Sequence, residues 1–207
     1  MWGHGMDVTA ILLAGGRSSR FGRDKSLLCW QDRPIVERLA EQCAAVADEV
    51  LIVSNSPGKF RLPGVRELSD RYPDMGPLGG LHAGLAEAAH PWVFVTACDM
   101  PLFHAALARD LLTFTAYCEA VLPRCGTRLQ PLFSVLRREP SLREAEWMLS
   151  HGRRRLRELY ERLDTFYLDL PDGGPGAGDP AADLFYNINY PADYERLVAG
   201  ARKEGNG

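Results

Sequence analysis

The sequence predicts an α/β fold, a three-layer sandwich with a mostly parallel central sheet. Short runs rich in β-branched residues and leucine alternate with amphipathic segments of helical period. The resulting order of strand, helix, strand, helix and strand is that of a parallel sheet with right-handed crossovers. The chain has 207 residues, of which 46% are hydrophobic and 25% charged, as in an ordinary globular protein. We expect a single domain over residues 1–207.

The first half of the chain contains the clearest elements. Strands are expected at VTAILLA (8–14), EVLIVSN (49–55) and WVFVTACD (92–99). The unbroken apolar run of the third is typical of a strand that is buried on both faces. Helices are expected over 33–47 and over 81–89. The apolar residues that give these helices their period are Ile35, Val36, Leu39, Cys43 and Val46 in the first, and Leu78, Leu81 and Leu85 around the second.

The second half is less regular, and its order of elements is mixed. A Gly/Pro-rich loop, PDGGPGAGDPAAD (171–183), has no hydrophobic period and is expected to be mobile. The segment LFYNIN follows it, and a helix is expected after Pro191. The other expected elements are a helix near 104–117, strands at 120–124, 131–136 and 165–170, and helices near 138–149 and 153–162.

Charge and cysteine usage narrow the classes of function. A net charge of −3 argues against a nucleic-acid-binding or membrane-binding surface, so basic chemistry must be local. The N-terminus has no cationic leader, and its apolar run AILLA is shorter than a signal-peptide core of about 7 to 15 residues. No stretch reaches the ~20 apolar residues of a membrane span. The 5 cysteines never form a C-x-x-C pair, so neither disulfides nor a zinc site is expected. We expect a cytoplasmic protein.

The stretch ILLAGGRSSRFGRDK (11–25) predicts a binding site for a small anion. It forms the turn after the first strand, at the end of the strand where α/β folds bind ligands. Gly15 and Gly16 allow the backbone N–H groups to approach phosphate oxygens, and Arg20 and Lys25 add positive charge. Arg17 and Arg23 lie in the same stretch, and for these two we favour solvated surface residues.

Two common phosphate-binding loops are excluded by the spacing of these residues. A P-loop requires G-x-x-x-x-G-K-[ST], whereas Lys25 lies three positions beyond Gly22. The dinucleotide fingerprint G-x-G-x-x-G is also missing, because Gly15 and Gly16 are adjacent. Neither an ATPase of the P-loop type nor a Rossmann dehydrogenase is indicated.

The sequence LAGGRSSRFGRDK resembles the L-A-G-G-x-S-x-R-M-G-x-D-K signature of the molybdenum cofactor guanylyltransferases, within the nucleotidyltransferases of the GT-A-like fold. Further segments occur in the family's order and extend the resemblance over almost the whole chain: DRYPDMGPLGGLHAGL from position 70, VTACDMP from 95, QPLF at 130–133 and NINYP from 187. Two positions depart from the family pattern. Phe21 replaces a common methionine, and Tyr190 stands where the family usually has threonine.

The resemblance implies a Rossmann-like fold of the nucleotide-diphospho-sugar transferase type and a specific reaction. The family transfers GMP from GTP to the terminal phosphate of molybdenum-molybdopterin and releases pyrophosphate. The attacking phosphate monoester has a second pKa of about 6, so it is mostly dianionic at pH 7 and needs no general base. Mg²⁺ is the expected cofactor, since it neutralises phosphate charge and takes only one or two protein carboxylates. Proteins that deliver molybdopterin or mature molybdoenzymes are possible partners.

The resemblance also assigns site residues. Arg20, Lys25 and Asp99 are expected to be catalytic, with Asp99 as the metal ligand at the end of the buried strand. Asn187 and Asn189 are two apart in an extended segment, so they would face the same side and position the second substrate or a metal-bound water. The residues expected to bind the nucleotide are Leu13, Ala14, Gly15, Lys25, Asn55, Asp70 and Asp99.

Each assignment has a structural alternative. Asp99 could instead cap the following helix, and the two asparagines could stabilise a turn. Asp70 could be a turn residue, with Asp74 as the nucleotide ligand. The basic segment HGRRRLRELYERL from 151 could receive the acidic pterin. We favour for it a solvated helix face, in which Arg154 pairs with Glu158 or Arg157 with Glu161.

Two alternative functions stay open. A molybdopterin cytidylyltransferase would carry out the same chemistry, but its signature resembles L-A-A-G, and Gly15 favours the guanine branch. A non-catalytic nucleotide-binding module would not need the Lys25 and Asp99 that this chain retains. Assaying pyrophosphate release with each nucleoside triphosphate separates these readings.

Overall fold

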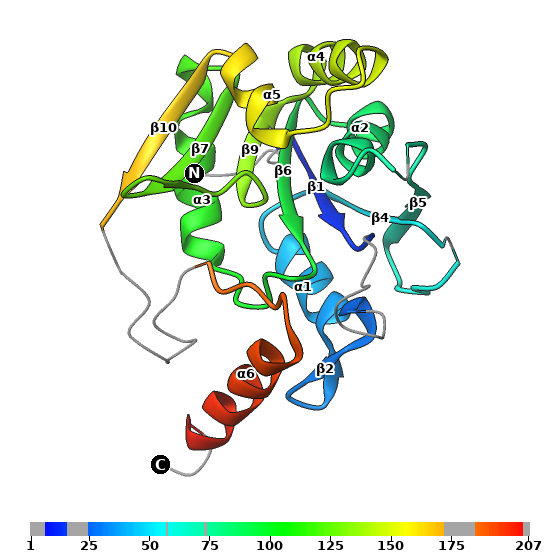
Figure 1. Cartoon of the computed structure of the whole chain (residues 1–207), viewed down its shortest axis with the longest axis vertical. Helices are drawn as coiled ribbons and strands as arrows, with labels where there is room; N and C mark the ends of the chain where they lie inside the picture. Colours follow the sequence, from blue (N-terminus) through cyan, green and yellow to red (C-terminus); the bar gives the residue numbers. More distant parts are fainter. Residues whose placement is uncertain (1–6, 16–24, 57, 73, 172–184, 205–207) are drawn as a thin grey trace.

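The protein is described from a computed structural model (Figure 1). The structure describes residues 7–15, 25–56, 58–72, 74–171 and 185–204. Within these residues, no helix has the length and apolar character that a membrane span requires.

A continuous mixed sheet forms the centre of the protein, in the strand order β10-β7-β9-β6-β1-β4-β5, with β8 paired to β7. The pairs β5–β4, β4–β1, β1–β6 and β7–β10 are parallel, and β9 runs antiparallel to both β6 and β7. The predicted mostly parallel sheet is therefore confirmed. Its strands are β1 (Val8–Leu13), β4 (Glu49–Ser54), β5 (Val65–Ser69), β6 (Trp92–Ala97), β7 (Ala120–Cys125), β8 (Arg128–Leu129), β9 (Ser134–Arg137) and β10 (Thr165–Leu170).

Helices cover both faces of the sheet (Figure 1). The strand β1 shows why, because its side chains alternate between two apolar cores. Ala10 and Leu12 belong to the core under α1 and α3, while Ile11 and Leu13 belong to the core under α2, α4 and α5. The predicted three-layer arrangement is confirmed. The helices are α1 (Ile35–Ala44), α2 (Pro77–Glu87), α3 (Ala105–Thr113), α4 (Arg138–Ser150), α5 (Leu156–Arg162) and α6 (Pro191–Glu204).

The C-terminal helix α6 extends from one end of the body, beside the short β-hairpin that precedes α1 (Figure 1). Its Leu197 is buried in the same core as α1, and the hydroxyl of Tyr194 donates a hydrogen bond to the carbonyl of Cys29. The hairpin consists of β2 (Cys29–Trp30) and β3 (Arg33–Pro34). It turns through Gln31 and Asp32, both with positive φ, as a two-residue hairpin turn requires.

Several predicted boundaries were wrong, because local geometry interrupts the pattern. The helix expected from 33 begins at Ile35, since Arg33 and Pro34 pair in the hairpin. The helix expected over 104–117 ends at Thr113 and is followed by a 3₁₀ turn, η2 (Thr115–Tyr117). The strand expected from 131 begins at Ser134. The Gly/Pro-rich loop lies almost entirely outside the described residues.

Candidate functional site

The carboxyl ends of four neighbouring parallel strands form one edge of the sheet. Backbone hydrogen bonds continue the strand register into the loops that leave them. The Ala14 N–H donates to Val53, and the Cys98 N–H donates to Leu13, at 2.8 and 3.0 Å. The order in which strands are added reverses at β1, because β4 and β5 lie on one side of β1 and the next strand in sequence, β6, lies on the other, parallel to it. Such a switch point is where open α/β sheets bind their ligands.

A long-range clamp joins Lys25, Ile188 and Asp99 at this edge. The Lys25 ammonium donates to the carbonyl oxygen of Ile188 at 2.7 Å, and the Ile188 N–H donates to the backbone oxygen of Asp99 at 2.8 Å. The clamp thus holds η1 (Lys25–Leu27), the end of β6 and the segment before α6 together. Ile188 was not identified from the sequence, because it acts through its backbone and its apolar side chain gives no signal.

Asp99 has the properties of a cation ligand. Its Oδ1 is buried and accepts no hydrogen bond within the described part of the chain. Burial raises the pKa of this carboxyl, and the nearby positive charge of Lys25 partly opposes that rise. A buried carboxylate oxygen without a protein partner is costly unless a cation or proton satisfies it. Asp99 therefore fits a hard cation such as Mg²⁺, which prefers oxygen ligands.

The structure argues against the alternative in which Asp99 caps a helix. The next helix, α3, begins only at Ala105, and its N-cap position is His104. No cluster of three or more His, Cys, Asp or Glu side chains able to hold a metal occurs among the described residues. A site based on Asp99 would consequently leave much of the coordination to water and substrate, as is usual for Mg²⁺.

The turn after β1 lies against Asn55, which follows β4. A Cβ added at Gly15 would lie 3.1 Å from Oδ1 of Asn55 and 3.6 Å from its backbone nitrogen. Any side chain at position 15 would thus crowd the asparagine, which explains a glycine there. The structure places Leu13, Ala14, Gly15 and Asn55 together at the sheet edge, as the sequence predicted.

Asp70 follows β5 at the same edge and lies beneath the first turn of α2. Its Oδ1 accepts a hydrogen bond from the Tyr72 N–H at 2.7 Å, so part of its role is the turn predicted as the alternative. A Cβ added at Gly79 would clash with the Tyr72 carbonyl and lie 2.9 Å from Asp70 Oδ1. A Cβ at Gly80 would lie 3.3 Å from Leu13. The double glycine therefore lets α2 approach Asp70 closely, a role that the sequence analysis missed although the Gly-Gly pair was visible.

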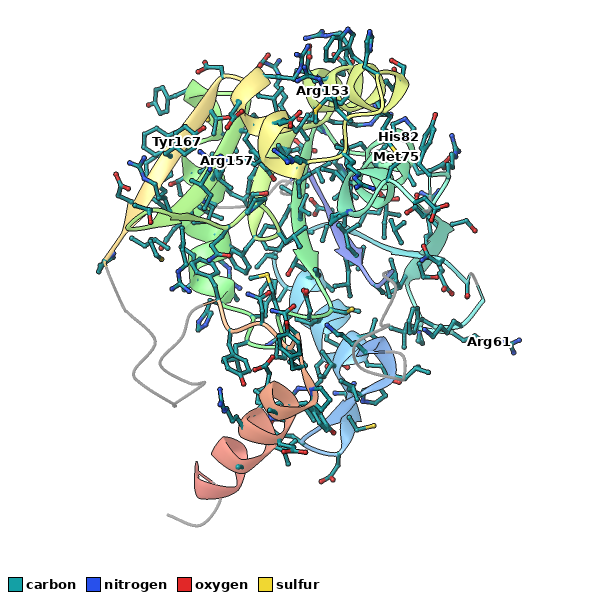
Figure 2. All side chains as sticks on the ribbon, viewed as in Figure 1. Arg61, Met75, His82, Arg153, Arg157 and Tyr167 are labelled. Carbon is teal, nitrogen blue, oxygen red and sulfur yellow. The ribbon has the colours of Figure 1, made fainter. Side chains whose placement is uncertain are left out.

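Burial distinguishes Asp70 from Asp74. Burial raises the pKa of the Asp70 carboxyl, while the hydrogen bond from Tyr72 and the charge of His82 oppose the rise. Asp74 is exposed in the turn that precedes α2. The His82 ring, labelled in Figure 2, contacts Tyr72 edge to face at 5.2 Å between centroids. Partial burial at the strand end makes Asp70 the better candidate for a ligand-binding carboxylate.

The two asparagines of the N-I-N segment have different surroundings. Asn187 is half-buried, and its side-chain amide donates to the carbonyl of Phe185 at 2.7 Å. Asn189 is exposed, and its backbone N–H donates to the Asp193 carboxylate at 2.9 Å, which caps the start of α6. The bond between Ile188 and Asp99 anchors this segment to the site, and the two asparagines are the sequence neighbours of Ile188.

Part of the predicted cationic site lies outside the described residues. This applies to Gly16, Arg17, Arg20 and Arg23, so their roles stay predictions. Of the four basic residues of that stretch, Lys25 is the one whose position the structure gives.

The basic segment from 151 lies at the opposite end of the molecule. Figure 2 shows Arg153 at the top of the view, whereas β1 and β6 run downward to their carboxyl ends in Figure 1. Arg157 pairs with Glu161 at 3.0 Å, as expected for a solvated helix face, while Glu158 pairs with Arg153 and not with Arg154. These contacts support the structural interpretation of this segment.

Comparison with known proteins identifies relatives over most of the chain. The family model of the MobA-like NTP transferase domain matches residues 10–166. A Deinococcus radiodurans protein named "Probable molybdenum cofactor guanylyltransferase" is 38% identical over 200 residues, which cover 93% of this chain and 94% of that protein. A Vibrio cholerae protein named "Molybdenum cofactor guanylyltransferase" is 32% identical over 202 residues, which cover 93% and 92% of the two chains.

The fold is shared with solved structures. The crystal structure of molybdopterin-guanine dinucleotide biosynthesis protein A from Archaeoglobus fulgidus matches with a TM-score of 0.75 at 22% identity, over 94% of this chain and 99% of that one. A 2-C-methyl-D-erythritol 4-phosphate cytidylyltransferase from Thermus thermophilus matches with a TM-score of 0.67 at 16% identity. At these identities the likeness shows a common fold.

Proposed function

Since the chain belongs to the MobA-like NTP transferase domain family, we propose that it transfers GMP from GTP to the terminal phosphate of molybdenum-molybdopterin. An oxygen of the acceptor phosphate attacks the α-phosphorus of GTP, the bond from that phosphorus to the bridging oxygen breaks, and pyrophosphate leaves with the electron pair. The acceptor phosphate is already mostly dianionic at pH 7, so no side chain has to remove a proton.

The observation that carries the proposal is the clamp of Lys25, Ile188 and Asp99 beside the ends of β6 and β1. Phosphoryl-type transfer needs alignment and neutralisation of charge more than covalent chemistry. Lys25 supplies a positive charge for the phosphates, and we propose that Arg20 adds a second. We propose that Asp99 holds Mg²⁺, which when bound stabilises the charge that develops on the departing pyrophosphate.

The remaining residues would bind the nucleotide and orient the acceptor. The backbone at Leu13, Ala14 and Gly15 approaches the nucleotide, because no side chain at position 15 is in the way. Asn55 and Asp70 border this turn from the neighbouring strands and would contact the base and ribose. Asn187 and Asn189 would position the acceptor.

A cytoplasmic location fits the proposed substrates and the cysteines. None of the five cysteines, all of which lie within the described residues, is in a disulfide, and Cys43 and Cys98 are buried. Cysteines outside disulfides are typical of reducing compartments. GTP is likewise a nucleotide of the cytoplasm.

The experiment that tests the function is an assay of pyrophosphate release with molybdopterin as acceptor and each of the four nucleoside triphosphates in turn. We expect release with GTP and Mg²⁺ and little with CTP, UTP or ATP. Release that is as fast with CTP would assign the protein to the cytidylyl branch, and absence of acceptor-dependent release with every nucleotide would refute the enzyme assignment.

A further inference from the structure

One carboxylate on the edge strand β5 holds the chain that leaves β4. The Ser54 hydroxyl donates to Glu67 Oε1 at 2.9 Å, and the backbone N–H groups of Gly58 and Phe60 donate to Glu67 Oε2 at 2.9 and 3.1 Å. We call residues 54–56 and 58–60 the β4 exit segment. Three hydrogen bonds from three of its residues thus converge on a single side chain.

The rest of the β4 exit segment depends on the same carboxylate. The Ser54 hydroxyl oxygen accepts the Ser56 N–H at 3.2 Å, so the bond to Glu67 also orients the group that holds Ser56. Gly58 has a φ of 84°, a left-handed conformation that glycine adopts without strain. Phe60 is 7% exposed and anchors the far end in the core. Hydrogen bonds from neutral donors to a carboxylate are stronger than those to a neutral acceptor, so Glu67 is well suited to fix this conformation.

The β4 exit segment carries Asn55, whose side chain lies against the backbone of Gly15. The Asp70 N–H donates to the Ser54 carbonyl at 3.1 Å, so Ser54 also connects to the neighbouring strand end. Asn55 therefore follows Ser54, whose side chain donates to Glu67. It precedes Gly58 and Phe60, whose backbone N–H groups donate to Glu67. Its amide presents both a donor and an acceptor, which is what reading the edge of a purine requires.

We propose that Glu67 is a positioning residue for recognition of the nucleotide base, acting through the β4 exit segment and Asn55. The inference rests on the proposed function for its substrate, a guanine nucleotide. The three hydrogen bonds of Glu67 described above all go to the segment, and Lys25 and Asp99, which we propose contact the phosphates and the metal, lie outside it. Its loss should therefore weaken binding of the base, with little effect on the rate at saturation.

The test compares three variants of the full chain. Glu67→Met has a similar length but accepts no hydrogen bond. Glu67→Gln keeps a carbonyl oxygen for the two backbone N–H groups and can donate its amide to the Ser54 oxygen, so it should restore function. Arg66→Met is the matched control, because Arg66 lies next to Glu67 on β5. This change removes the ion pairs of Arg66 with Glu49 and Glu87 and leaves the hydrogen bonds of Glu67 to the segment in place.

Calorimetry with GTP and with ATP in the presence of Mg²⁺ measures base selectivity directly. For Glu67→Met we expect GTP affinity to fall about tenfold, with a much smaller change for ATP. Glu67→Gln should stay within about threefold of the wild type, and Arg66→Met within about twofold. In the pyrophosphate assay, Glu67→Met should raise the KM for GTP and leave kcat and the KM for the acceptor close to those of the wild type.

Other outcomes would overturn the inference. Unchanged GTP affinity in Glu67→Met, or an equal loss for GTP and ATP that accompanies a lower melting temperature, would leave Glu67 a purely structural residue. If Glu67→Met does not fold, Ser54→Ala removes one of the three bonds, and unaltered selectivity in that variant would refute the proposal. A wild-type protein that binds no GTP would overturn the proposed function itself, and with it this inference.

Discussion

Replacing Asp99 by asparagine removes a buried negative charge without changing the size of the side chain. In the free protein Asp99 Oδ1 accepts no hydrogen bond within the described residues, and burial already disfavours the ionised form. The substitution should therefore not lower the melting temperature, since the cost of burying the charge disappears with the charge.

The effect on turnover should be much larger. Removing one group that stabilises charge in the transition state typically lowers kcat by about 100- to 1,000-fold, or roughly 2.7 to 4 kcal/mol. We therefore expect Asp99→Asn to lower kcat by about 100-fold or more at saturating Mg²⁺, with a smaller change in GTP affinity. The assay is acceptor-dependent pyrophosphate release, measured alongside a thermal melt.

Asp74→Asn is the matched control, because Asp74 is an exposed carboxylate that lies before α2 near the same edge of the sheet. It should retain nearly normal turnover. An Asp99→Asn enzyme with unchanged kcat would refute the assignment of Asp99 as the metal ligand. A large fall in melting temperature would instead indicate that the carboxylate stabilises the fold.

Three further predictions follow from the contacts of individual side chains. Lys25→Met should weaken GTP binding, which calorimetry measures. It should also lower the free energy of unfolding by about 1 kcal/mol, more than the ~0.5 kcal/mol of an exposed site, because Lys25 donates to the Ile188 carbonyl; chemical denaturation measures this effect. Tyr160→Phe removes a buried hydroxyl that is hydrogen-bonded to the Pro131 carbonyl at 2.7 Å and to the Ser134 hydroxyl at 2.6 Å, while Ser134 can still donate to that carbonyl. Stability should fall by about 1 kcal/mol and the melting temperature by about 2 to 4 °C, and an unchanged melt would contradict this. Burial opposes ionisation of Glu49, but hydrogen bonds from Ala89, Thr9 and Arg66 outweigh it and lower the pKa of this carboxyl. The ionised Glu49 therefore stabilises the fold above its unfolded pKa of about 4.3, and this stabilisation is lost as the pH falls through the folded pKa. The difference in unfolding free energy between the wild type and Glu49→Gln should shrink in acid, and a difference that stays constant with pH would refute the reasoning.

The strand ends were predictable from the sequence, and the contacts between distant segments were not. Apolar runs identify β1, β4 and β6, and parallel pairing then places Gly15, Asn55 and Asp99 at one edge of the sheet. The bond between Lys25 and Ile188 joins residues 163 positions apart, and no local pattern signals it.

A strand at the edge of the sheet is also hard to predict from the sequence. Strand β5 was missed because its sequence VRELS is half polar and only partly buried, so it has no clear period. Glu67 was missed with it, since a glutamate on an unrecognised strand looks like an ordinary surface charge. The alternative prediction that Asp70 is a turn residue is confirmed in part, since its carboxylate accepts a hydrogen bond from the Tyr72 N–H. This role was predictable because aspartate commonly accepts a hydrogen bond from the backbone two residues further on.

The most direct test of the proposed reaction follows the phosphorus atoms of GTP into the products. The purified protein is incubated with Mg²⁺, molybdopterin and GTP labelled either at the α-phosphate or at the γ-phosphate. Transfer of GMP predicts that the α label appears in a pterin dinucleotide and the γ label appears in pyrophosphate, both only when the acceptor is present. Release of the γ label as inorganic phosphate, or an α label that never enters the pterin, would contradict the account.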